Sequence, residues 1–95
     1  MKTKHKTTHE ENLARLARIE GQLRGVRRMV EEGAYCVDII TQVQAVCAAL
    51  QAVGRKILRK HMEHCVSEAL QGGSKENIRR KIGEVISILE RGGKL

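Results

Sequence analysis

One run of the chain, from Cys36 to Leu70, constrains the fold more than any other feature. It contains no proline, and its apolar residues recur every three or four positions, which places them on one side of an α-helix. A helix of about 35 residues is about 50 Å long, far beyond the usual three or four turns, so it needs packing partners along its whole extent. The predicted apolar stripe consists of Val37, Ile40, Val43, Cys47, Leu50, Val53 and Ile57.

A shorter helix is predicted on either side of this run. Thr8 and Glu11 have the spacing of a capping box, which predicts that the first helix starts there, and Gly33 can adopt the left-handed conformation that ends it. Ser74 can cap a third helix, which we expect to end at the pair Gly92-Gly93. The apolar positions are Leu13, Leu16, Ile19, Leu23, Val26 and Val30 in the first helix and Ile78, Ile82, Val85 and Leu89 in the third.

The composition favours an all-α fold. The 95 residues include one Tyr and no Trp or Phe, whereas sheets draw heavily on aromatic side chains. We expect a single domain, residues 1–95, in which an antiparallel helical hairpin is followed by the short third helix. A chain of this length buries only about 60–65% of the surface that it exposes when unfolded, so self-association is expected, and two hairpins would form a four-helix bundle.

The charge of the chain predicts a polyanionic partner. The formal net charge is +7, with 18 Lys and Arg against 11 Asp and Glu. We expect no membrane contact, because no apolar run approaches the roughly 20 residues that span a bilayer and the first residues lead into no signal sequence. A cytoplasmic protein with three cysteines is expected to use them for metal, redox chemistry or packing rather than in structural disulfides.

His61, Cys65 and Cys36 form the candidate metal site. His61 and Cys65 are four residues apart and therefore neighbours on a helix, and the direction of Cys36 agrees with that of His61 to within roughly 20°. Along the axis, however, Cys36 and His61 are nearly 40 Å apart, so one chain cannot bring them to one ion. A second, antiparallel copy with its dyad near Ala49 and Leu50 would place Cys36 of one chain beside His61 and Cys65 of the other, twice per dimer.

Two thiolates and one imidazole form a soft ligand set that suits Cu(I), whereas Zn(II) would need a fourth ligand. The spacing alone leaves open that Cys36 and Cys65 are small core residues and that His61 is a surface histidine. We interpret Cys47 as a packing residue and His64 as solvated. An enzyme is disfavoured because no orienting carboxylate or oxyanion donor accompanies the Cys-His pair.

Three segments resemble the CsoR/RcnR family of bacterial metal- and stress-sensing repressors: GQLRG at residues 21–25, AYCVD at residues 34–38 and HMEHC at residues 61–65. The resemblance covers nearly the whole chain. It implies a dimer of helical hairpins that pairs into a dimer of dimers, with Cu(I) held by Cys36 of one protomer and His61 and Cys65 of the other. The pattern of Cys36 with His61 and Cys65 matches the copper-sensing CsoR branch of the family. The resemblance therefore implies that the metal-free protein binds operator DNA and that Cu(I) binding releases it and derepresses copper-resistance genes.

The same resemblance implies a set of residues around the metal. Tyr35 matches a tyrosine that, with a glutamate on the third helix, is thought to hydrogen-bond the liganding histidine. At the position of that glutamate this chain has Arg80, and the nearest acid is Glu84. We expect Glu84 to substitute for it, or the network to differ.

Two groups of basic residues are predicted to bind the DNA. Arg15 and Arg18 share one face of the first helix, and Arg55, Lys56 and Arg59 cluster on the second, followed by Lys60. By resemblance, Arg15 and Arg55 match positions implicated in operator binding. A solvated helix face is the plainer interpretation, but four positive charges within six residues repel one another unless an anion is present.

Other functions fit parts of the pattern. A persulfide or thiol sensor of the same family would need only Cys36 and Cys65, and a sensor of nickel, cobalt or zinc would recruit more nitrogen ligands, such as His5 or His9. A copper-storage protein or chaperone would need no DNA.

Overall fold

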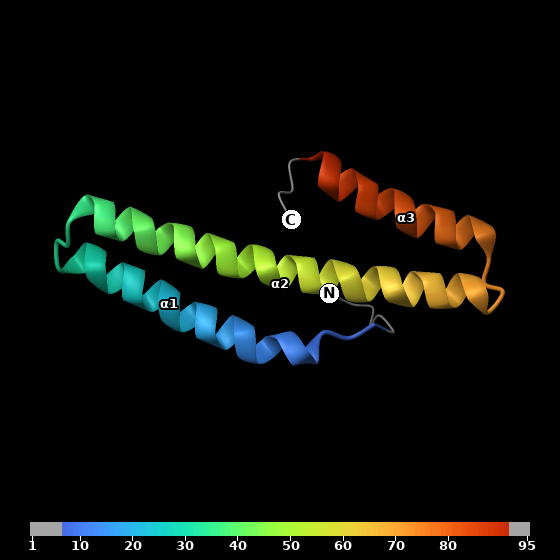
Figure 1. Cartoon of the computed structure of the whole chain (residues 1–95), viewed down its shortest axis with the longest axis horizontal. Coiled ribbons are helices and arrows are strands. Elements are labelled where there is room, and N and C mark those ends of the chain that lie inside the picture. Colours follow the sequence, from blue (N-terminus) through green and yellow to red (C-terminus); the bar gives the residue numbers. More distant parts are fainter. Residues whose placement is uncertain (1–6, 92–95) are drawn as a thin grey trace. The chain divides into compact units, whose positions relative to one another are not determined.

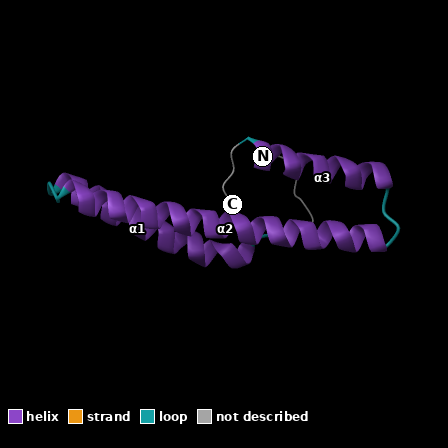
Figure 2. Cartoon of the chain, turned by 45° about the horizontal axis from the view of Figure 1, so that its top comes forward, coloured by secondary structure: helices purple, strands orange, loops and turns teal. Residues whose placement is uncertain are grey.

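The computed structural model describes residues 7–91, and its regular structure there is entirely helical, as predicted (Figures 1 and 2). The short 3-10 helix η1 (Glu10–Asn12) leads into α1 (Leu13–Glu31), which is followed by α2 (Cys36–Leu70) and α3 (Lys75–Glu90). The predicted bounds of the long helix are confirmed. The expected end of α3 at Gly92-Gly93 lies outside the described residues.

The chain divides into two compact units. The first, which we call the α1 unit, is His9–Val53 and holds η1, α1 and the first half of α2. The second, the α3 unit, comprises the described residues from Gly54 onward together with Thr7 and Thr8, and holds the second half of α2 and α3. The prediction of one domain is left untested by this division.

In the α1 unit, α1 and the first half of α2 run antiparallel and side by side (Figures 1 and 2). Ile19 of α1 and Val46 and Val53 of α2 are its buried apolar residues. The predicted stripe of α2 is therefore only partly right, because it includes Val53 but omits Val46. Four of its members are exposed by 42–56% in the single chain: Val37, Ile40, Val43 and Leu50. The physical reason is that α2 is apolar on two sides and α1 covers only one of them.

The start of α1 differs from the prediction. Neither His9 at the start of η1 nor Asn12 at the start of α1 makes a side-chain capping bond, and the capping box at Thr8 and Glu11 is not formed. Instead, the Asn12 amide donates to the His9 carbonyl at 2.9 Å, so the entry turn satisfies its own backbone. The Thr8 carbonyl accepts a hydrogen bond from Lys60 Nζ within the α3 unit.

The turn after α1 confirms the predicted role of Gly33. This glycine has φ 71°, in the left-handed region, and its amide donates to the Val30 carbonyl at 3.1 Å. The Ala34 amide donates to the Met29 carbonyl at 2.9 Å. These two bonds form a Schellman motif, which satisfies carbonyls at the end of α1 and directs the chain into α2.

The turn after α2 repeats this motif. Gly72 has φ 83°, and the Gly73 amide donates to the Glu68 carbonyl at 2.9 Å. A Cβ atom at Gly73 would lie 2.9 Å from that same carbonyl oxygen, so glycine is needed there because the backbone approaches closely. Ser74 then caps α3 as predicted, with its hydroxyl accepting from the Asn77 amide at 3.3 Å.

Helix α2 bears on the expectation of no membrane contact without testing it. By length and composition it is apolar enough to cross one, with a mean hydropathy of 1.5 over 18 residues, and residues 39–54 carry no charge. The core helix of a soluble bundle passes the same test. The apolar runs of α2 are short, but the polar residues that separate them within residues 39–54 are uncharged.

Candidate metal centre

Cys36 is the first residue of α2, and it is exposed in the α1 unit. The first turn of α2 is closed by the backbone, because the Tyr35 carbonyl accepts from the amides of Asp38 and Ile39 at 3.0 and 3.1 Å. The thiol of Cys36 is therefore presented at a defined helix end and is accessible to a ligand from outside its unit.

His61 and Cys65 lie one turn apart near the other end of α2, in the α3 unit. Their spacing makes them neighbours on one side of the helix, as predicted. His61 is half-buried, whereas Cys65 is 3% exposed and is the one apolar core residue of the described part of this unit. The two thiols of the predicted site thus differ strongly in exposure.

Within residues 7–91, no three His, Cys, Asp or Glu side chains lie close enough together to hold a metal ion. Cys36 belongs to the α1 unit, whereas His61 and Cys65 belong to the α3 unit. That a second chain completes the set stays a prediction. The donors present, two thiols and one imidazole, have the chemistry that Cu(I) prefers.

The sequence analysis missed a series of polar contacts beside His61 and Cys65 that joins His64, Glu68 and Lys81. His64, which was expected to be solvated, has Nε2 3.9 Å from Glu68 Oε2, and Glu68 Oε1 accepts from Lys81 Nζ of α3 at 2.8 Å. The Glu68 and Lys81 side chains are 29% and 18% exposed. The spacing of His64 and Glu68 could have predicted the first contact, but nothing local in the sequence identifies Lys81 as the partner of Glu68.

The two residues expected to support His61 belong to different units. Tyr35 is 69% exposed in the α1 unit, and Glu84 is exposed on α3. Arg80, which the resemblance places at the position of the family's glutamate, donates to Asn77 Oδ1 at 2.5 Å within α3. The roles of Tyr35 and Glu84 stay predictions.

Cys47 was interpreted as a packing residue, but it is exposed in this chain. It lies in the α1 unit among the exposed members of the α2 stripe, including Val43 and Leu50. A packing role for Cys47 would therefore require this side of α2 to be covered by something outside the α1 unit.

The predicted DNA-binding residues are all exposed: Arg15, Arg18, Arg55, Lys56 and Arg59. Arg15 is oriented within its own unit, since its Nη1 atom donates to the Glu11 carbonyl at 3.3 Å and to Asn12 Oδ1 at 3.4 Å. The two arginines of α1 belong to the α1 unit, and the three residues of α2 belong to the α3 unit.

Residues 8–91 match the model of a family described as metal-sensitive transcriptional repressor. The copper-sensing transcriptional repressor RicR of Mycobacterium tuberculosis is 47% identical over 68 residues, which cover 70% of this chain and 71% of RicR.

Two solved structures are similar over nearly the whole chain. The Cu(I)-containing copper-sensing repressor CsoR of Geobacillus thermodenitrificans has a TM-score of 0.74 and 43% identity, covering 95% of this chain and 94% of CsoR. The nickel-responsive transcriptional regulator InrS has a TM-score of 0.72 and 36% identity, covering 94% of this chain and 97% of InrS.

Proposed function

The chain belongs to the metal-sensitive transcriptional repressor family, and from this premise we propose that it is a copper-sensing repressor. It binds operator DNA in the metal-free form and releases the DNA when Cu(I) binds. As a repressor it is not an enzyme, and we assign it to the cytoplasm because that is where its DNA target would be.

Two observations together support this proposal: the chemistry of the candidate ligands and the similarity of the chain to a copper-sensing repressor. Cys36, His61 and Cys65 supply two sulfurs and one nitrogen, and the chain is 43% identical to a copper-sensing repressor whose structure contains Cu(I). Bound there, Cu(I) would crosslink soft donors that a single chain keeps apart. We propose that Cys36 comes from one protomer and His61 and Cys65 come from its partner.

Self-association follows from the apolar surface of the single chain. The exposed side of α2 carries Val37, Ile40, Val43 and Leu50, each with 42–56% of its surface open. Burying such a stripe lowers the free energy by about 25 cal/mol per Å² of apolar surface removed from water. This gain favours a second copy of the chain that packs against the stripe. We propose an antiparallel homodimer, paired further into a tetramer.

Copper and DNA compete through this assembly. If Cu(I) binds better to a conformation that fits DNA worse, the same coupling free energy makes DNA weaken Cu(I) binding, and a coupling of about 1 to 3 kcal/mol is typical. The DNA side of the switch is supplied by Arg15 and Arg18 of α1 and by Arg55, Lys56 and Arg59 of α2. These cations neutralise phosphates of the DNA backbone. They position the protein on the DNA but do not recognise the DNA sequence.

The test measures operator binding by fluorescence anisotropy with and without Cu(I), using the DNA upstream of the gene. We expect Cu(I) to weaken binding by about 5- to 150-fold, the range of that coupling. Cys36→Ala should keep the metal-free affinity and lose the response, and X-ray absorption of the copper-loaded protein should detect two sulfurs and one nitrogen. A Cys36→Ala protein that still releases DNA on Cu(I) addition would refute the role of Cys36.

Nickel sensing is the second candidate, because the chain is 36% identical to a nickel-responsive regulator. A nickel sensor would release DNA at lower free Ni(II) than free Cu(I) and would show additional nitrogen ligands in X-ray absorption. Of the two histidines proposed to supply these ligands, His9 is half-buried in the α1 unit and His5 lies outside the described residues. The His61→Ala variant distinguishes a persulfide sensor from a copper sensor. In a persulfide sensor this variant would still respond to persulfide, whereas in a copper sensor it should lose the response to copper.

A further inference from the structure

The first part of α3 carries a group of cations that the proposed function leaves unused. Four basic residues occur between positions 75 and 81, and Glu76 is the one acid among them. Lys81 differs from the others, because it is 18% exposed and its Nζ atom donates to Glu68 Oε1 at 2.8 Å. Its charge is therefore neutralised inside the α3 unit.

The other three form what we call the α3 cation patch: Lys75, Arg79 and Arg80. All three are exposed, and nothing in the described range 7–91 pairs any of them with a carboxylate. Arg80 donates to Asn77 Oδ1 at 2.5 Å, but that amide is neutral and leaves the charge uncompensated. Three cations within six residues repel one another, and the single charge of Glu76 offsets only part of this repulsion.

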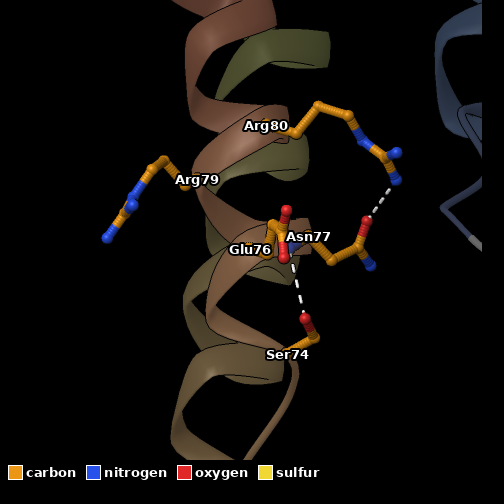
Figure 3. A pocket seen from close by; sticks show the side chains of 5 residues that line it. All are labelled: Ser74, Glu76, Asn77, Arg79 and Arg80. Carbon is orange, nitrogen blue, oxygen red and sulfur yellow. Dashed lines mark hydrogen bonds between the residues drawn. The ribbon is translucent and has the colours of Figure 1, made fainter.

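The patch borders hollows in the surface of the α3 unit. One hollow of about 610 Å³ is lined by Ser74, Glu76, Asn77, Arg79 and Arg80. Figure 3 shows Arg79 and Arg80 leaving the helix on opposite sides, with Glu76 between them and Ser74 below. A second hollow, also of about 610 Å³, has Lys75 and Arg79 at its edge. Arg79 borders both, so the cations reach over an open surface instead of a closed binding pocket.

We propose that Lys75, Arg79 and Arg80 bind phosphates of the DNA backbone, as an additional contact of the repressor with its operator. Guanidinium groups suit this ligand because they offer several donors in a planar fork, and an open surface suits a polymer better than a small anion that needs enclosure. The contact strengthens binding and positions the protein without reading bases. This inference rests on the proposed function and adds a second helix of the α3 unit to its DNA-binding surface.

The test compares the salt dependence of operator binding by the full-length, metal-free protein and its variants. The double variant Arg79→Gln/Arg80→Gln should lower the slope of log affinity against log salt by about 0.9 for each phosphate that it no longer neutralises. Glu76→Gln should have the opposite effect and raise affinity at every salt concentration. The factor by which Cu(I) weakens binding should stay at the wild-type value in both.

A matched control separates a local contact from a general loss of charge. Arg27→Gln/Arg28→Gln removes the same two charges from α1, where Arg27 already lies 3.5 Å from Glu31. We expect its slope to change less than that of the α3 double variant. Equal slope changes in the two double variants would overturn the inference, as would an unchanged affinity in Glu76→Gln.

A final arm separates DNA phosphate from free phosphate. Inorganic phosphate is titrated into the protein while the backbone amide signals of residues 74–80 are followed by NMR. Saturable shifts there combined with an unchanged DNA salt slope in Arg79→Gln/Arg80→Gln would overturn the assignment to DNA. If the double variant does not fold, Glu76→Gln decides alone. A wild-type protein that does not bind operator DNA refutes the proposed function, whereas one that binds and releases normally with unchanged slopes refutes only the α3 cation patch.

Discussion

The two ends of α2 present their thiols in opposite ways. Cys36, in the α1 unit, is exposed at the first residue of the helix, whereas Cys65, in the α3 unit, is 3% exposed. A buried thiol is held in place by its surroundings, while an exposed one can meet a ligand from another molecule. The comparison indicates that the α3 unit provides the more constrained part of the proposed copper site and the α1 unit provides the accessible part.

The two units also hold themselves together differently. The α1 unit buries Ile19, Val46 and Val53, whereas α3 is joined to α2 by the ion pair between Lys81 and Glu68. In the α3 unit four apolar residues of α3 stay 38–49% exposed, namely Ile82, Ile86, Ile88 and Leu89, whereas Ile78 and Val85 are half-buried. Both units therefore leave apolar side chains exposed in the single chain.

The largest effect is expected on Cu(I) binding when Cys36 is removed from one chain and Cys65 from another. Cys36→Ala and Cys65→Ala proteins should each lose three-coordinate Cu(I) binding when tested alone. After their chains are mixed and exchanged, half of the dimers are mixed and each contains one intact site, so about one quarter of the wild-type sites should return. The measurement is Cu(I) stoichiometry in the presence of a competing chelator.

Cys47→Ala serves as the control for the mixing experiment, because it removes a thiol that the proposed site does not use. It should keep full Cu(I) stoichiometry. An absence of recovery in the mixed sample, despite proven exchange of chains, would contradict the assignment of one site to two protomers.

A smaller effect is expected in the reactivity of the thiols. In the metal-free protein, iodoacetamide should modify Cys36 more than about tenfold faster than Cys65, because a buried thiol reacts only after local opening. Peptide mass spectrometry follows each cysteine separately, and mild denaturant should bring the rates together. Equal rates in the folded protein would remove the contrast between the two units.

The smallest effect concerns one glycine in each unit. Gly73→Ala should lower the free energy of unfolding by more than about 1 kcal/mol, because its Cβ would lie 2.9 Å from the Glu68 carbonyl oxygen. Gly25→Ala should raise it by up to about 1 kcal/mol, because a Cβ there meets no atom within 4 Å in the described chain and alanine favours the helix. Urea unfolding at fixed protein concentration measures both. A loss of stability in Gly25→Ala would indicate that another chain approaches α1 at this position.

Local signals in the sequence predicted most of the secondary structure. Two signals were sufficient to locate α2: the absence of proline, and the glycines Gly33 and Gly72 on either side of the helix. Ser74 was correctly identified as the cap of α3. The capping box predicted at Thr8 and Glu11 is not formed, because the backbone just before α1 forms the 3-10 helix Glu10–Asn12 instead. A side-chain cap is only one of several ways to satisfy the first amides of a helix.

The ligand types of the candidate site were also accessible from the sequence, since a Cys and a His-x-x-x-Cys turn on one long helix are visible in it. Their surroundings were not. The pairing of Glu68 with Lys81 joins residues 13 apart on two helices, and no periodic pattern within one helix predicts such a contact.

By itself, the sequence determined the helices, where two of them stop, and the soft donors they carry, because these properties depend on residues a few positions apart. The tertiary structure decided which side of α2 is covered by α1 and that Cys65 is enclosed while Cys36 is open. These outcomes depend on which helix packs against which, and α2 is apolar on more than one side, so its own periodicity is compatible with several arrangements.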